Sequence, residues 1–166
     1  AKKIFDSGFE KVILNTCLFT KPHVVSEIAK IYGSQSVVIS LDVKRDFWGK
    51  LYPFHSGGIV KVKDGYVSVA KTAESLGAGE IVIRDINQDG VMDGMNLSLI
   101  TEIADSVAVP VVATGGAWSM NHVKDAISAG AHSVAAGNMF VYQGARKAVL
   151  INYPTQSELK EVLNVT

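Results

Sequence analysis

Short apolar runs alternate along the chain with longer segments in which apolar residues recur at helical spacing. The runs that are rich in β-branched residues and apolar on both faces are 11–15, 36–43, 80–86, 109–116 and 133–138. Strands with one solvated face alternate apolar and polar positions, whereas runs without this alternation are typical of parallel strands covered on both sides. The pattern therefore predicts five parallel strands that are covered on both sides.

Between these runs, apolar residues spaced three and four apart predict amphipathic helices that connect one strand to the next. The four apolar stripes are Val24, Ile28 and Ile31; Tyr66, Val69, Ala73 and Leu76; Ile100, Ile103 and Val107; and Val123, Ala126, Ile127 and Gly130. Gly33, Gly77 and Gly130 are placed to end helices, because glycine readily adopts the left-handed conformation found there. Thr155 and Glu158 form a capping box that predicts a last helix. Repeated strand–helix units of this kind indicate an α/β fold.

The connection after the second strand, residues 44–62, is longer than the others. It has aromatic residues around Gly49 and a Gly-Gly pair at 57–58, which predicts a β-hairpin or a flexible flap. Segments of this kind often serve as lids over a site. The alternative is a solvated hairpin that packs Trp48 and Tyr52 on the surface. Both interpretations stay open.

The composition favours one globular domain over residues 1–166, because 48% hydrophobic residues can bury a core. Sixteen basic and sixteen acidic residues leave no formal net charge, so no surface for nucleic acid or for an anionic membrane is indicated. No apolar run approaches the ~18 residues of a membrane helix, and no signal peptide is recognisable. We therefore expect a cytoplasmic protein without nucleic-acid or membrane partners. A phosphorylated small molecule is compatible with this charge, because backbone amides can hold phosphate.

Residue types that bind metals are sparse. Cys17 is the only cysteine, which excludes an internal disulfide and a cysteine-based zinc site. We expect it to be a small buried residue near a strand end. No two of the four histidines, His23, His55, His122 and His132, have a ligand spacing such as i, i+4. The sequence indicates neither a metal nor a cofactor.

The segment DINQDGVMDGMN, residues 85–96, places Asp85, Asn87 and Asp89 at the first three ligand positions of a calcium-binding loop. That loop requires a final glutamate and a preceding helix, whereas Asn96 stands at its last position and a strand precedes it. We interpret the segment as a connection from the C-terminal end of a strand to a helix. This is where α/β proteins place their sites.

Small residues follow the fourth and fifth strands. Thr114, Gly115 and Gly116 stand at the end of one strand, and Gly137 and Asn138 follow the other. Turns of this type open the following helix and allow backbone amides to approach an oxyanion. Two such turns at the end of the chain match the phosphate site after the seventh and eighth strands of a (βα)8 barrel. Close packing of helix on strand also favours glycine, but we predict a phosphate cradle here.

Two acidic residues complete the candidate site. Asp42 closes an otherwise apolar strand, and Asp89 lies in the loop after the next strand. Paired carboxylates in a partly desolvated site can divide the roles of acid and base, because burial and mutual repulsion separate their pKa values. The alternative is that Asp89 forms an Asx turn or a helix N-cap.

Four segments carry a resemblance to a known family: GSQSVVISLDVKR, GAGEIVIRDINQDGVMDG, VPVVATGGAWSMNHVKDAISAGA and SVAAGNMF. From residue 3 to residue 142 the chain resembles the second half of the HisF family, the cyclase subunit of imidazole glycerol phosphate synthase. The resemblance implies a TIM (βα)8 barrel that takes ammonia from a glutaminase subunit of the HisH type. It also implies conversion of a phosphoribulosyl imidazole-carboxamide nucleotide into imidazole glycerol phosphate and an aminoimidazole carboxamide ribotide.

The resemblance further implies roles for individual residues. Asp42 matches the catalytic aspartate of the fifth barrel strand, and Asp89 lies in the acidic loop after the sixth. Lys11 and Glu80 match charged residues that ring the ammonia entrance, although a structural ion pair is the alternative. The residues that fall on the two phosphate sites are Thr114, Gly115, Gly116 and Asn138 on one, and Asn15 and Thr16 on the other.

The sequence departs from the family in three respects. It supplies about five of the eight strand–helix units of a closed barrel, so no counterpart of the catalytic aspartate on the first barrel strand is present. The open edges of such a partial barrel are expected to associate with another copy. Arg84 and Asp85 alter the loop after the sixth barrel strand, and Asn96 replaces an acidic residue. Residues 142–163 resemble the ending of HisF-like paralogues found with surface-polysaccharide genes, which are thought to deliver ammonia for amidation of a sugar.

Three functions therefore stay open. The first is an ammonia-dependent synthase subunit of the HisF type, with the sugar-amidating paralogue as its main variant. The second, favoured by the strand count, is a catalytically inactive partial barrel that self-associates. The third is a sugar-phosphate isomerase of the related histidine-pathway barrel. Lys11 and Glu80 favour the ammonia user over the isomerase, because an isomerase needs no ammonia entrance.

Overall fold

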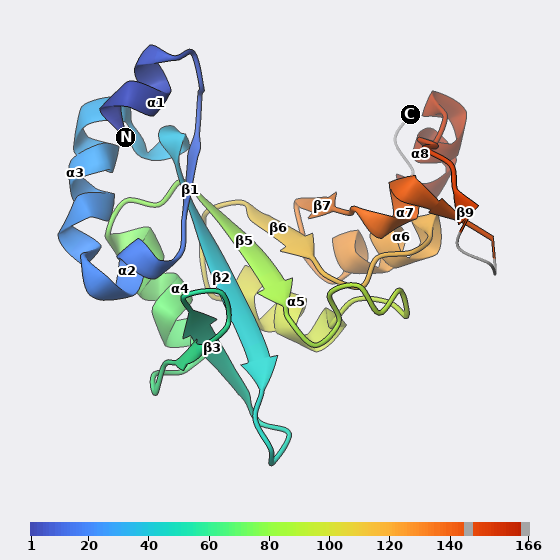
Figure 1. The fold of residues 1–166 in the computed structure, drawn as a ribbon, viewed down its shortest axis with the longest axis horizontal. Coiled ribbons are helices and arrows are strands. Elements are labelled where there is room, and N and C mark those ends of the chain that lie inside the picture. The colour runs from blue at the N-terminus through green and yellow to red at the C-terminus, as the bar shows by residue number, and fades with distance from the viewer. Residues whose placement is uncertain (145–147, 164–166) are drawn as a thin grey trace.

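Five parallel strands form the centre of the computed structural model, which describes residues 1–144 and 148–163 (Figure 1). Each of the five predicted strands is present. Their order across the sheet is β1-β2-β5-β6-β7, since β1 and β5 pair with β2, and β6 pairs with β5 and β7. Their bounds are β1 Val12–Leu14, β2 Val37–Arg45, β5 Glu80–Asp85, β6 Val111–Thr114 and β7 Ser133–Ala135.

Helices connect these strands, as the apolar spacing predicted. Their bounds are α1 Lys2–Asp6, α2 Thr16–Thr20, α3 Pro22–Tyr32, α4 Tyr66–Ser75, α5 Leu97–Ala104, α6 Met120–Ser128, α7 Asn138–Val141 and α8 Gln156–Leu163, with a 3-10 turn η1 at Ser34–Ser36. Gly33, Gly77 and Gly130 follow α3, α4 and α6 with positive φ and confirm the predicted helix ends. The Thr155–Glu158 capping box is also confirmed, because each residue's backbone N–H donates to the other's side chain.

The helices lie on one side of a curved sheet that does not close into a barrel (Figure 1). Alternate residues of β2 and β5, such as Leu41 and Ile83, are buried against α3, α4 and α5. On the opposite, inner face, Ile13 is 65% exposed and Ser133 is also exposed. Within the described residues, the predicted cover is therefore present on the helix face of the strands and incomplete on their inner face. A run of apolar residues shows only that both faces of a strand carry apolar side chains. Such side chains also fill the interior of a small barrel.

One predicted apolar stripe is displaced. Val25 and Ile28 are the buried residues of α3, whereas Ile31 is 70% exposed. Successive helical residues are turned by about 100°, so a face centred between Val25 and Ile28 leaves Ile31 at its edge. The helix is correctly predicted, and Ile28 and the partly buried Val24 contact the core as expected, but Ile31 does not.

Residues 46–61 form the predicted hairpin. Strand β3 (Leu51–His55) pairs antiparallel with the end of β2 and with β4 (Val60–Lys61). Lys61 lies 3.3 Å from the centre of the Tyr52 ring and forms an ion pair with Asp46 at 3.1 Å. At the tip, Trp48 is 87% exposed. Lys61 thus braces the turn through Asp46 while Trp48 beside it stays exposed, and a role as a lid stays a prediction.

A hydrogen bond between Tyr66 of α4 and Glu102 of α5 joins these helices, and burial together with this bond should raise the pKa of the tyrosine. The Tyr66 hydroxyl donates to Glu102 at 2.6 Å. Burial first, and then this bond and the Glu102 charge, raise the pKa of Tyr66 to about 12, above the ordinary value of about 10. The stability that this neutral hydroxyl contributes is complete below pH 10 and is lost as the pH rises through about 12.

An absorbance titration of phenolate formation tests this assignment. Tyr66 is expected to ionise near pH 12, and Tyr66→Phe should remove that step from the titration curve. Glu102→Gln should move the step part of the way towards pH 10, because the burial contribution remains. A Tyr66→Phe difference curve centred near pH 10 would contradict the assignment.

Both lateral edges of the sheet are open within the described residues. The only partner of β1 is β2, and the only partner of β7 is β6. A short ladder of β8 (Tyr142–Gln143) and β9 (Ala148–Val149) forms a separate sheet. Free strand edges can pair with another chain, so association between copies stays a prediction. In residues 1–144 and 148–163, no helix has the length and apolar character that crossing a membrane requires.

Candidate functional site

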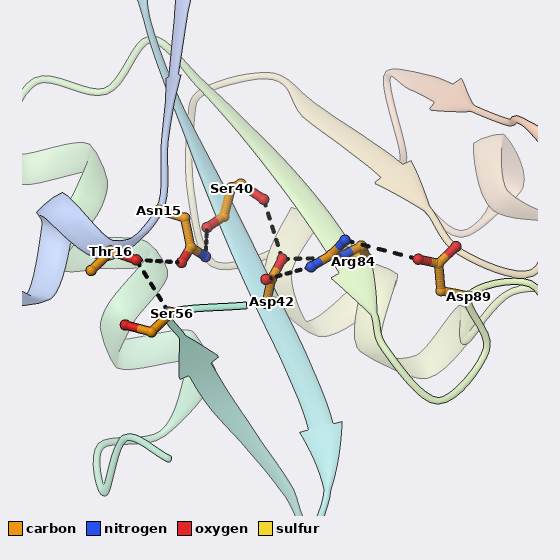
Figure 2. A network of polar contacts seen from close by, with 7 residues as sticks. All are labelled: Asn15, Thr16, Ser40, Asp42, Ser56, Arg84 and Asp89. Carbon is orange, nitrogen blue, oxygen red and sulfur yellow. Dashed lines mark hydrogen bonds and ion pairs between the residues drawn. The ribbon is translucent and has the colours of Figure 1, made fainter. Parts of the chain in front are cut away.

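A row of polar side chains crosses the carboxyl ends of the strands (Figure 2). It begins at the end of β1, passes over the inner face of β2 and β5, and ends in the loop after β5. In parallel strands these ends lie at one edge of the sheet, which is why residues distant in sequence meet here. The side chains in this row are Asn15, Thr16, Ser40, Asp42, Ser56, Arg84 and Asp89.

Asp42 lies at the centre of the row and is held by Arg84. These residues are register partners on β2 and β5, so their side chains lie on the same face. Arg84 donates from Nε to Oδ1 at 3.1 Å and from Nη2 to Oδ2 at 2.7 Å. Ser40, two residues before Asp42 on the same face, also donates to Oδ1 at 3.3 Å. Both oxygens of the buried Asp42 carboxylate are therefore engaged.

Arg84 also separates the two predicted catalytic carboxylates. Its Nη1 lies 3.9 Å from Oδ2 of Asp89, on the side away from Asp42 (Figure 2). Repulsion between the carboxylates was the premise for dividing acid and base roles between them. The Arg84 guanidinium lies between the two carboxylates, so each carboxylate is attracted to Arg84 and direct repulsion between them no longer supports the division of roles. The proton-transfer roles of Asp42 and Asp89 stay predictions.

The loop after β5 is fixed by Asp85 rather than by Asp89. Asp85 is buried and accepts from the backbone N–H of Asn87 at 2.9 Å, which makes an Asx turn. It also accepts from Asn96 Nδ2 at 2.7 Å, while Asn96 Oδ1 caps α5 by accepting from the Leu99 N–H. The Asx turn and N-cap that we considered for Asp89 thus belong to Asp85 and Asn96, and the Asp89 side chain is left 54% exposed.

The residues of the predicted phosphate cradle line one cavity of about 70 Å³, a space for a group of few atoms. The two small-residue turns selected from the sequence meet there, and the loop after β5 joins them. Within residues 1–144 and 148–163 no lysine or arginine lines the cavity, so these residues would hold an anion by backbone amides and by the side chains of Thr114 and Asn138. The lining residues are Asp89, Gly90, Met92, Thr114, Gly115, Gly116, Ala117, Ala135, Ala136, Gly137 and Asn138.

Gly115 and Gly116 also allow the backbone of the loop after β5 to pack closely against this turn. Both have positive φ, and a Cβ on Gly116 would overlap the carbonyl oxygen of Gly94. The Gly94 N–H donates to the Gly116 carbonyl at 3.1 Å. The expectation that this turn directly opens a helix is wrong, because Ser119 caps α6 three residues later. Asn138, in contrast, starts α7 directly after Gly137.

Asn15 and Thr16, predicted for the opposite phosphate site, stand at the other end of the row. Asn15 Nδ2 donates to the Ser40 carbonyl at 2.9 Å and ties β1 to β2. The Thr16 hydroxyl oxygen accepts from the Ser56 backbone N–H at 3.1 Å. The hairpin therefore reaches back to this end of the site. Ser56 could not be selected from local pattern, because 40 residues separate it from Thr16. Ser40 could have been found from its two-residue offset to Asp42.

Lys11 and Glu80 lie together at the opposite end of the strands. Lys11 directly precedes β1, Glu80 opens β5, and Lys11 Nζ lies 2.5 Å from Glu80 Oε2. Their side chains are 49% and 22% exposed. The structure therefore brings Lys11 and Glu80 together. Their ion pair is consistent both with a gate for ammonia and with a purely structural role.

Histidine and cysteine side chains take structural positions. Nδ1 of His132 accepts from the Val111 N–H and Nδ1 of His122 from the Trp118 N–H, each at 3.3 Å. Cys17 is half-buried rather than buried, with Sγ 3.6 Å from the Lys21 carbonyl oxygen. In the part of the chain that the structure describes, no three His, Cys, Asp or Glu side chains are arranged to hold a metal ion.

The chain is similar in sequence to a known protein family and to several named proteins. The profile of the family described as histidine biosynthesis protein matches residues 1–147. A Pseudomonas aeruginosa protein, provisionally named an imidazole glycerol phosphate synthase subunit, is 41% identical over 96% of this chain and 64% of its own length. A similarly named Leptospira borgpetersenii protein is 38% identical over 98% of this chain and 65% of its own length. The imidazole glycerol phosphate synthase subunit HisF of Oceanobacillus iheyensis is 36% identical over 95% of this chain and 62% of its own length. The chain thus spans 62–65% of the length of these relatives.

Proposed function

Because the chain belongs to the histidine biosynthesis protein family, and to its HisF branch, we propose that it acts as the ammonia-dependent cyclase subunit of an imidazole glycerol phosphate synthase. The observation that carries the proposal is the cavity beside Asp89, in which the predicted phosphate-binding residues meet. The substrate would be the phosphoribulosyl imidazole-carboxamide nucleotide. A cytoplasmic location and the absence of a cofactor fit this chemistry.

The row of polar groups suits a substrate with phosphates at both ends. One phosphate would lie in the cavity, on the amides around Gly115, Gly116 and Gly137 and on Thr114 and Asn138. The other would lie near Asn15 and Thr16 at the far end of the row. The reacting part would then lie over β2 and β5. Holding both ends fixes its orientation, which lowers the entropic cost of reaction.

Of the two carboxylates, Asp89 is the one that can reach such a substrate. Its side chain is 54% exposed and borders the cavity, whereas that of Asp42 is 4% exposed and bonded through both oxygens. We assign proton transfer to Asp89 in the first place. Asp42 takes part by holding Arg84, or by direct proton transfer once Arg84 has moved away.

The Lys11–Glu80 pair is proposed to guard the route by which ammonia from a HisH-type glutaminase enters. Lys11→Met should lower glutamine-dependent turnover by about tenfold and leave turnover with added ammonium unchanged, because ammonium in bulk bypasses the route. As an exposed ion pair it should contribute at most about 1 kcal/mol to stability. The two activities are measured on the same preparation, so the ammonium rate is the internal control. Equal loss of both activities would indicate a purely structural pair.

The function itself is tested by measuring turnover of the nucleotide at high ammonium concentration. Formation of imidazole glycerol phosphate and the carboxamide ribotide in equal amounts is the expected result. The amidation of a surface-polysaccharide sugar is the second candidate, favoured by the resemblance of residues 142–163 to the ending of such paralogues and by the departures at Arg84, Asp85 and Asn96. A folded protein that binds phosphate but does not turn over the nucleotide would favour this alternative. Absence of phosphate binding would favour the inactive, self-associating partial barrel.

A further inference from the structure

Arg84 is the accessible member of the ion pair at the centre of the site. Its side chain is 38% exposed, against 4% for Asp42. The Asp42 oxygens accept three hydrogen bonds from Arg84 and Ser40 and face into the protein. Any molecule that lies over these strand ends therefore meets the guanidinium before it meets the carboxylate.

Arg84 also has hydrogen-bonding capacity left over. A guanidinium carries five N–H groups, and its bonds to Asp42 use only Nε and Nη2. Within residues 1–144 and 148–163, Nη1 makes no hydrogen bond, since its 3.9 Å distance to Asp89 is too long for one. The bidentate pair fixes the plane of the guanidinium, so these remaining donors have a set direction.

The unused donors lie close to the phosphate cavity. Arg84 and Thr114 are register partners on β5 and β6, and both Thr114 and Asp89 line the cavity. Among the described residues, that lining contains two glycine turns and one carboxylate but no cationic side chain. Arg84, whose Nη1 lies 3.9 Å from the cavity-lining Asp89, can thus supply positive charge beside the cavity, and it offsets the charge of Asp42.

We propose that Arg84 is a specificity-determining residue that binds a second negatively charged oxygen of the substrate, next to the phosphate held in the cavity. Asp42 is then a positioning residue, which acts by holding the guanidinium. The inference rests on the proposed function in one respect, that the cavity holds a phosphate. It goes beyond it by naming a preference: among phosphorylated compounds, the site favours those with a carboxylate or similar oxyanion a short distance from the phosphate. An uncharged carbonyl oxygen would use the same contact more weakly.

Two small probes test the proposal by calorimetric titration. 3-Phosphoglycerate carries a phosphate and a carboxylate on a three-carbon chain, and glycerol 3-phosphate is its counterpart without the carboxylate. We expect the protein to bind the first about tenfold more tightly, as one charge-assisted hydrogen bond implies. Arg84→Gln should bring this ratio of Kd values close to one while glycerol 3-phosphate still binds. Arg84→Lys keeps the positive charge but loses the planar, bidentate guanidinium, so the ratio of the two Kd values should be intermediate.

Arg45→Gln is the matched control. It removes the same charge from the end of β2, where the Arg45 side chain reaches only the hairpin backbone at Gly49, so the ratio should not change. A wild-type ratio near one, or a ratio that survives in Arg84→Gln, overturns the role of Arg84 and leaves the phosphate cavity standing. If the Gln variant does not fold, an undiminished ratio in Arg84→Lys overturns the proposal and a reduced one supports it. Failure of both probes to bind the wild type overturns the cavity's assignment and the inference together.

Discussion

Gly116→Ala is expected to lower Tm by roughly 5 °C or more and to abolish phosphate binding. Gly116 has φ +97°, a left-handed conformation that costs a residue with a side chain about 1–3 kcal/mol. For a chain of this length each kcal/mol lowers Tm by about 2–4 °C. The new Cβ would also overlap the backbone oxygen of Gly94. Since backbone cannot rotate aside as a side chain can, the loop after β5 would have to move away from the cavity.

Thermal unfolding and a titration with inorganic phosphate measure the two effects. Gly137→Ala is the control for stability, because Gly137 lines the same cavity with negative φ and open space around its Cβ position. Its Tm should change by less than about 1 °C. Equal stability of the two variants would show that the contact between Gly116 and Gly94 does not hold the loop.

Asp89→Asn is expected to lower ammonia-dependent turnover by about 10²-fold or more, with little change in KM. A positioned acid or base contributes about 10²–10⁴-fold to rate. The amide keeps the size of the side chain and its place beside the cavity but cannot take up a proton. The loss should therefore fall on kcat, and phosphate binding should persist or strengthen because one negative charge is gone.

Steady-state kinetics of three aspartate variants separate this role from a general effect of charge. Asp93→Asn makes the same change at an exposed position of the same loop and should leave kcat within about twofold. Asp42→Asn should also reduce kcat, with a weaker preference for 3-phosphoglycerate because Arg84 loses its bidentate partner. If Asp89→Asn were fully active and Asp42→Asn were not, proton transfer would have to be assigned to Asp42 instead.

The strand–helix succession was readable because it depends on local pattern. Runs such as 36–43 and 80–86, the helix-ending glycines and the Thr155–Glu158 box each act within a few residues of sequence. The convergence of Thr114, Gly115, Gly116, Gly137 and Asn138 on one cavity was also predictable. It follows from the rule that parallel strands present their carboxyl ends at one edge.

Other features depend on how side chains meet across strands. The sequence showed Arg84 only as a departure from a pattern, and the register of β2 with β5 brings it against Asp42. Asp85 was grouped with Asn87 and Asp89 by spacing, yet the alternation of a strand turns it towards the helices and leaves Arg84 on the inner face. A one-residue change of register would reverse such pairings.

The fold class, the order of the elements and the edge of the sheet that carries the candidate site could be predicted from local pattern, as could most residues that line the cavity proposed for phosphate. Three features depend on tertiary contacts: helices cover one face of the described sheet, Asp42 is bonded through both oxygens, and Arg84 is the group exposed over it. Periodicity and turn chemistry act within a few residues, whereas ion pairing and exposure depend on contacts between segments about 40 residues apart.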